Sequence, residues 1–236
     1  MAAGKKTKSG EHHSNLGSKL RDFILGWQDG LVNVLGIVLG IVAATASTKI
    51  VLISGLAATC AESISMAAVA YTSMKASRDF YNSERQRENR EVDTVPDVER
   101  QEIRGIYFKK GFRGKFLETI VKKITGNKKR WVDIMMQEEL RLFPEKSTPV
   151  QSAILVGLSA VIGSVIPLIP FALLPVQQAL WYALAISSVV LFFIGFMKSK
   201  LTTGNVVKAG IEMLVIGMAA ALTGYAIGLV LGVTIT

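Results

Sequence analysis

Cysteine and histidine are almost absent from this sequence. Cys60 is its single cysteine, and its two histidines, His12 and His13, are adjacent in the N-terminal tail. One cysteine permits neither an intrachain disulfide nor a cysteine-based zinc site. Without histidine beyond the tail, the Glu-x-x-His pattern of di-iron oxidases is excluded, and so are zinc sites that need imidazole. An enzyme such as a ferroxidase is therefore disfavoured, and we expect no catalytic residues and no resident cofactor.

Long uncharged runs occupy much of the chain. Half of the 236 residues are hydrophobic and the mean hydropathy is +0.39, which is the composition of a membrane protein. A helix needs about 20 apolar residues to cross a bilayer. Pro167 and Pro170 predict that the third run is kinked or ends early. We expect an all-α polytopic protein with five membrane-spanning helices, near residues 21–47, 50–72, 150–174, 176–197 and 206–235.

A strongly charged segment separates the second run from the third. It favours helices, which we place near 74–93, 97–110 and 115–143, the first continuing out of the second span and the last interrupted. The polar residues at the N-terminus predict a disordered tail. The predicted parts are therefore a tail at 1–18, spans one and two at 19–73, a helical charged domain at 74–147, and spans three to five at 148–236.

The basic residues predict the orientation in the membrane. Five Lys or Arg precede span one, eighteen lie in the central segment and three lie between spans four and five, and the remaining one is Lys49. With five spans, the three basic regions fall on one side, which the positive-inside rule assigns to the cytosol. This topology explains the formal charge of +9 without nucleic acid or a lipid adaptor role. An organelle membrane of the vacuolar type or a prokaryotic plasma membrane fits equally.

Acidic residues inside the spans are candidates for an ion path. Asp29 is the only ionisable residue between Phe23 and Ala46, with Asn33 one turn later, and Glu62 is the only charge of span two, with Met66 one turn later. A carboxylate within a span is costly and usually faces protein or water. Glu212, near the start of span five, provides a third acid or pairs with Lys208.

Glycines four residues apart predict close helix packing, within one chain or across a dimer. These are Gly26 with Gly30, Gly36 with Gly40, and Gly224 with Gly228 and Gly232.

Three clusters in the charged segment have spacings that suit a metal site. They are Glu84, Glu88 and Glu91; Glu99 and Glu102; and Met135, Glu138 and Glu139. Members three, four or seven residues apart share a helix face. Carboxylates suit Fe²⁺, Mn²⁺ or Mg²⁺, and a thioether favours softer transition metals. The alternative is ordinary pairing of these glutamates with the many neighbouring arginines.

Several short motifs occur together and in a fixed order. DGLV begins at Asp29, ISMA begins at Ile64 after an acid, and MMQEEL begins at Met135 before span three. In this arrangement the chain, from Arg21 onward, resembles the vacuolar iron transporter family, the ferrous-iron exporters of plant and yeast vacuoles and their microbial and protozoan relatives. The resemblance implies a homodimer of five-span chains with a three-helix cytoplasmic metal-binding domain.

The resemblance also implies roles for particular residues. The implied metal ligands are Glu88, Glu91, Glu99, Glu102, Met135 and Glu139, and the implied pathway residues are Asp29 and Met66. Plant members commonly carry an acid where this chain has Ala70, so we add Glu62 to the pathway. We expect a proton-coupled antiporter for Fe²⁺ or Mn²⁺ that exports metal from the cytosol. The alternative is a membrane-anchored metal buffer or sensor without transport.

Overall fold

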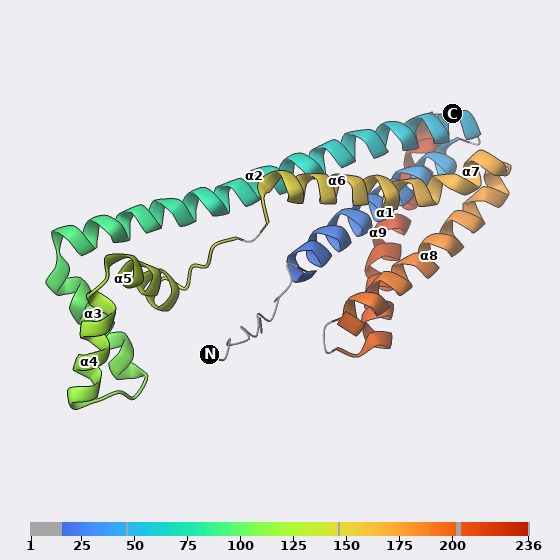
Figure 1. Ribbon diagram of the computed structural model, residues 1–236. Helices are drawn as coiled ribbons and strands as arrows, with labels where there is room; N and C mark the ends of the chain where they lie inside the picture. Colours follow the sequence, from blue (N-terminus) through green and yellow to red (C-terminus); the bar gives the residue numbers. More distant parts are fainter. Residues whose placement is uncertain (1–15, 46, 146, 202–203, 236) are drawn as a thin grey trace, which may run out of the picture. The chain divides into compact units, whose positions relative to one another are not determined.

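The computed structural model describes residues 16–45, 47–145, 147–201 and 204–235, whose regular secondary structure is helical throughout (Figure 1). Most of the predicted tail lies outside the described residues. In chain order the elements are α1 (Leu16–Ala44), α2 (Thr48–Thr94), α3 (Pro96–Lys109), α4 (Gly114–Thr125), α5 (Lys128–Ile134), the π-helical turn η1 (Met135–Glu139), α6 (Pro149–Val165), the 3-10 turn η2 (Ile166–Leu168), α7 (Ile169–Leu173), α8 (Val176–Leu201) and α9 (Val206–Ile235).

The chain forms two compact units. The apolar unit comprises the described residues within 1–71 and 149–236, and the polar unit comprises those within 72–148. Both contain part of α2, whose 47 residues measure roughly 70 Å at 1.5 Å per residue. That length is about twice the hydrocarbon thickness of a bilayer. Only the part of α2 up to about Thr72 is apolar, so we treat this part alone as membrane-spanning.

Within the described residues, five helical segments are long and apolar enough to cross a membrane, in agreement with the five predicted runs. The two prolines interrupt the third as predicted. Pro167 lies in η2 between the end of α6 and the start of α7, and Pro170 lies in the first turn of α7. Proline removes a backbone donor and clashes with the preceding turn, so a continuous α-helix is disfavoured there.

Helix α1 is the core of the apolar unit because α6, α8 and α9 all pack against it. The side chains of Leu31, Val34, Leu35 and Val38 have no exposed surface. Close approach depends on glycine: a Cβ added at Gly228 would overlap the carbonyl group of Gly40.

Glycines also allow neighbouring helices to approach closely along two sides of α1. Gly26 and Gly30 lie against the backbone of α6, whereas Gly36 and Gly40 lie against α9. The predicted close packing therefore occurs within one chain, and the glycine spacing no longer supports a dimer.

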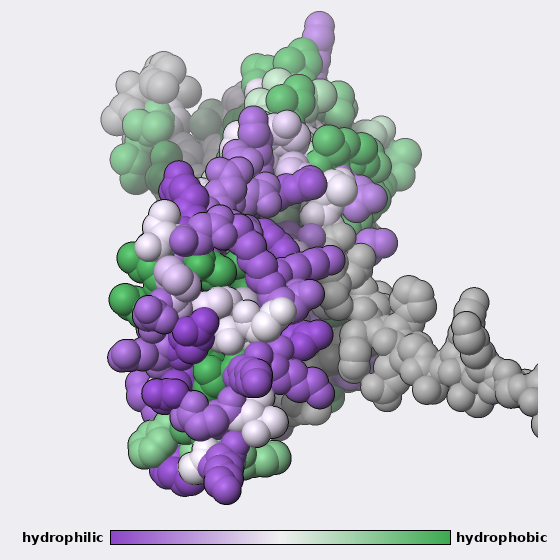
Figure 2. All heavy atoms as spheres, turned by 60° about the vertical axis from the view of Figure 1, so that its left-hand side comes forward, coloured by the Kyte–Doolittle hydropathy of each residue, from purple (hydrophilic) through white to green (hydrophobic). Residues whose placement is uncertain are grey.

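The polar unit has its own hydrophobic core. Ile103, Trp131, Met135 and Met136 are each at most 4% exposed and pack together. Figure 2 shows that hydrophilic side chains cover most of the face turned to the viewer. An amphipathic arrangement of this kind buries one face of each helix and leaves the charged face in water.

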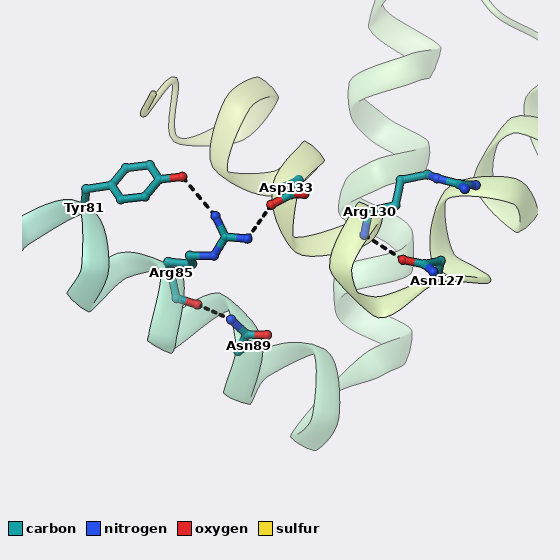
Figure 3. A network of polar contacts seen from close by, with 6 residues as sticks. All are labelled: Tyr81, Arg85, Asn89, Asn127, Arg130 and Asp133. Atoms are coloured by element: carbon teal, nitrogen blue, oxygen red, sulfur yellow. Dashed lines mark hydrogen bonds and ion pairs between the residues drawn. The ribbon is translucent and has the colours of Figure 1, made fainter. Parts of the chain in front are cut away.

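The interruption predicted within the helix near 115–143 is confirmed, whereas the predicted C-terminal bound is wrong. The structure divides it into α4, α5 and η1, which ends at Glu139. Gly126 and Asn127 separate α4 from α5, and the Asn127 side chain accepts a hydrogen bond of 2.9 Å from the backbone N–H of Arg130 (Figure 3). Asparagine is a favoured N-cap, so a new helix starts there.

Candidate functional site

A cavity of about 420 Å³ lies between α1 and α2 in the apolar unit. Its polar lining includes Asp29 and Asn33 from α1 and Glu62 and Ser65 from α2, and Met66 adds a thioether. Asn33 and Ser65 are exposed, so the cavity opens at the surface of the single chain. The structure thus brings together the three residues predicted for an ion path, Asp29, Glu62 and Met66.

Glu62 is held by polar side chains of the facing helix. Asn33 donates a hydrogen bond of 2.5 Å from Nδ2 to Oε1 of Glu62, and the Asp29 carboxyl is near enough to interact with Glu62. The two acids therefore face each other across the cavity. Paired carboxylates of this kind bind either a cation or a shared proton, because both cannot remain ionised and unpaired at short range.

The other residues raised by the sequence lie elsewhere. Ala70 is absent from the cavity lining, so an acid in its place would lie about two turns further along α2 than Glu62. Glu212 is exposed on α9, and among the described residues it forms no ion pair with Lys208. The suggested pairing of those two residues is wrong.

One buried acid escaped the sequence analysis. Asp22, 3% exposed, accepts a hydrogen bond from the Ser152 hydroxyl at 2.5 Å and pairs with Arg21 at 3.0 Å. It ties the first turns of α1 to the start of α6. The sequence places Asp22 beside a basic residue at the edge of the apolar run, which reads as an ordinary surface pair. Its spacing of two helical turns from Asp29 was the available signal.

The polar unit buries two glutamates that come from different helices. Glu88 on α2 is 2% exposed and Glu99 on α3 is 4% exposed. The Oε2 atom of each is buried without a hydrogen-bond partner. A buried carboxylate oxygen left without a donor is strongly unfavourable, so each such atom needs an explanation. A cation ligated by these oxygens would satisfy both.

Burial and mutual repulsion raise the pKa values of both glutamates to about 7. Burial, followed by the charges of Glu139 and Glu91, raises the pKa of Glu88 from 4.5 to about 7. Burial, followed by Glu102 and Glu88, raises the pKa of Glu99 likewise to about 7. The negative charges of the five glutamates predicted for metal binding thus act on one another, which indicates that these five side chains cluster.

Of the remaining predicted ligands, Glu102 and Glu139 act on these two glutamates, and Met135 lies in the hydrophobic core of the polar unit. Met135 is fully buried in η1, and the side chains of Glu102 and Glu139 interact directly. Partial desolvation, followed by Glu102, raises the pKa of Glu139. The π-helical turn that carries Met135 and Glu139 was not predicted. Such turns are rare and frequently occur at functional sites.

Arginine pairing, the alternative raised from the sequence, is present for one cluster. Arg87 contacts Glu84 at 2.9 Å, Glu91 at 3.5 Å and Glu88 at 3.7 Å. Arg87 itself is 45% exposed, so it screens the cluster from the solvent side only. In the present side-chain positions, no three His, Cys, Asp or Glu residues of the described chain are placed to hold a metal ion.

A polar network fixes α2 against α5 in the polar unit (Figure 3). Arg85 bonds Asp133 on α5 at 2.6 Å and the Tyr81 hydroxyl at 3.1 Å, while Asn89 donates to the Arg85 carbonyl. Because η1 follows α5 directly, the network sets the position of Met135 relative to α2.

Comparison with known proteins identifies the family of this chain. Residues 20–229 match the model of the VIT family. The chain belongs to the VIT family. The family resemblance inferred from the motifs is thereby confirmed, and VIT family members are transporters rather than enzymes.

Relatives from plants and protozoa match along nearly the whole VIT chain. A protein named vacuolar iron transporter from Centaurea cyanus is 33% identical over 219 residues, 91% of this chain and 89% of the relative. Vacuolar iron transporter 2 of Oryza sativa subsp. japonica is 33% identical over 217 residues, with 91% and 88% covered. The vacuolar iron transporter of Plasmodium berghei is 32% identical over 235 residues, with 95% and 86% covered. The chain is thus an integral membrane protein of a metal transporter family.

Proposed function

We propose that this VIT family chain exports Fe²⁺ from the cytosol in exchange for protons, with Mn²⁺ as a second substrate. The receiving side is a vacuole-like compartment or the cell exterior. The observation that supports the proposal most is the cavity between α1 and α2, where Asp29 and Glu62 face each other within the apolar unit. The choice of iron as the metal is inferred from relatives named vacuolar iron transporters.

Competition for the same carboxylates provides the exchange. A divalent ion binds the ionised acids, whereas protonation neutralises them and weakens the ion's hold. The Met66 thioether at the same cavity favours a transition metal over Mg²⁺ or Ca²⁺. A proton gradient directed into the cytosol then drives metal outward.

In this proposal the polar unit captures metal before transport. The ligands are Glu88, Glu91, Glu99, Glu102, Met135 and Glu139, which turn inward around the ion as it binds. The partnerless oxygens of two of these acids support the assignment, and so does the buried thioether. Placing this unit in the cytosol, together with the N-terminus, follows the positive-inside rule.

The transporter works as a homodimer in this proposal. The cavity opens at the surface of one chain, and nearby apolar residues of α2, among them Leu56 and Ile64, are 54% and 71% exposed. A second copy covering this face would close the side of the cavity and remove its acids from lipid, where a carboxylate is costly.

Flux measurement tests the proposal. Full-length protein is reconstituted in liposomes and Fe²⁺ uptake is followed with and without a pH gradient. We expect the gradient to accelerate transport and Asp29→Ala to abolish it, while the exposed acid variant Glu118→Gln on α4 transports normally. Transport that ignores the gradient would refute proton coupling, and unchanged transport by Asp29→Ala would refute the pathway.

The second candidate function is a membrane-anchored metal buffer or sensor. It is favoured by the buried glutamates of the polar unit, which suit metal binding without any need for a path. A buffer binds metal stoichiometrically but shows no accumulation beyond its own sites. Metal binding without flux in the same liposomes would select this alternative.

A further inference from the structure

A second cavity in the apolar unit, distinct from the acidic one, has an almost wholly apolar lining. Its volume is about 480 Å³, within the range of small-molecule sites, and it lies between α1 and α8. The α1 side consists of Leu20, Phe23, Ile24 and Trp27, three or four residues apart on one face. Phe23 and Trp27 meet edge to face, with ring centroids 4.9 Å apart, which gives this wall a fixed shape.

The α8 side of this α1–α8 groove runs from Val189 to Lys198. The nine steps between these ten residues rise roughly 13 Å along the helix, which is less than half of the roughly 30 Å hydrocarbon core. The groove is therefore confined to one leaflet. Val189 and Phe193 are 68% and 59% exposed, so its side is open at the surface of the apolar unit.

Basic residues mark one end of the groove. Lys198 belongs to its lining, Lys200 lies two residues further in the last turn of α8, and the exposed Lys19 precedes the lining residue Leu20 on α1. The candidate spans end here, at Gly17 and at Lys200, so these cations lie at the level of lipid headgroups. The sequence from Lys19 to Trp27 has Asp22 as its only acid, and Asp22 is buried against Ser152.

We propose that the α1–α8 groove binds an anionic phospholipid, with an acyl chain along Phe23, Trp27 and Phe193 and the phosphate at Lys198. Charge and shape together select this occupant. An apolar slot within one leaflet fits an acyl chain, and basic pockets between membrane helices bind acidic headgroups. The site is independent of the proposed transport. The bound lipid would contact α1, the helix that also carries Asp29.

Trp27 provides a reporter within the groove. The full-length protein, in nanodiscs of phosphatidylcholine, is titrated with phosphatidylglycerol or phosphatidylcholine that carries brominated chains, which quench tryptophan on contact. Trp181, 70% exposed on α8, is replaced by Phe, whereas Trp131, 4% exposed in the polar unit, remains as a constant background. One basic residue near the headgroups contributes about 1 kcal/mol, so we expect half-maximal quenching at about fivefold less phosphatidylglycerol than phosphatidylcholine.

Variants separate the headgroup contact from general charge. Lys198→Ala should remove the fivefold preference, and Lys208→Ala, in the first turn of α9, should preserve it. Val190→Phe, which fills the groove, should weaken quenching by both lipids. Equal quenching by the two lipids in the parent protein would overturn the proposal. So would equal losses in the two lysine variants, or no quenching at all, as expected if a second copy of the chain covers the groove.

Discussion

Replacing Glu99 by glutamine should stabilise the metal-free protein while impairing metal binding. The Glu99 carboxyl is 4% exposed and its pKa is raised from 4.5 to about 7, first by burial and then by Glu102 and Glu88. The folded protein therefore binds more protons than the unfolded chain between these pKa values. Its stability falls as pH rises through this window.

The magnitude follows from the same shift. A difference of one pKa unit corresponds to about 1.36 kcal/mol, so at about pH 8 the ionised Glu99 destabilises the fold by roughly 3 kcal/mol. At about pH 4, where the carboxyl is protonated in both states, this contribution vanishes. Glu99→Gln should thus be more stable than the parent at the higher pH and nearly equal to it at the lower.

Thermal unfolding of the full chain in detergent, with and without Fe²⁺, measures both effects. Metal should raise the melting temperature of the parent by mass action and raise that of Glu99→Gln much less. Glu118→Gln is the matched control, because Glu118 is 56% exposed and forms only a surface pair with Arg104. A variant that is less stable than the parent at the higher pH, or equally stabilised by metal, would refute the reasoning.

Three further predictions concern the glycine packing in the apolar unit, the Arg85 network and the glutamate ligands. Gly228→Ala should lower stability by about 1–3 kcal/mol, because its Cβ would overlap Gly40, whereas Gly105→Ala, with open space around it, should be neutral or stabilising in the same thermal melts. Arg85→Ala should weaken metal binding measured by calorimetry and cost about 1 kcal/mol of stability, since it removes the link to Asp133; an unchanged affinity would show that the network does not position η1. Metal binding by the parent should strengthen from about pH 6 to about pH 8 and release protons, because the ligands bind as carboxylates; calorimetry in buffers of different ionisation enthalpy counts those protons, and an affinity independent of pH would contradict the glutamate assignment.

The spans could be predicted because their signal is local. Five apolar runs exceed the length that a bilayer requires, and Pro167 and Pro170 interrupt a helix wherever they occur. The interruption of the third polar helix was predicted as well, because Gly126 disrupts a helical pattern, but the N-cap at Asn127 was not. Asparagine caps a helix only if the backbone turns there, and the turn depends on the packing of α5 against α2.

For the candidate site, the sequence predicted which residues share a helix face but not which residues of different helices are in contact. Helical spacing placed Asn33 beside Asp29 and Met66 beside Glu62, but the bond from Asn33 to Glu62 depends on how α1 and α2 meet. No sequence pattern gives that register. The choice between arginine pairing and metal binding was open for the same reason, because Arg87 reaches three glutamates and leaves the buried oxygens of Glu88 and Glu99 without partners.

The most direct test of the account is Fe²⁺ flux through reconstituted Asp29→Asn and Glu62→Gln proteins whose polar units remain intact. Each substitution keeps the shape of the side chain and removes its charge within the cavity between α1 and α2. The account predicts that both variants still bind Fe²⁺ through the polar unit but transport it at a small fraction of the parent rate under the same pH gradient. Parent-like flux in both variants would contradict it.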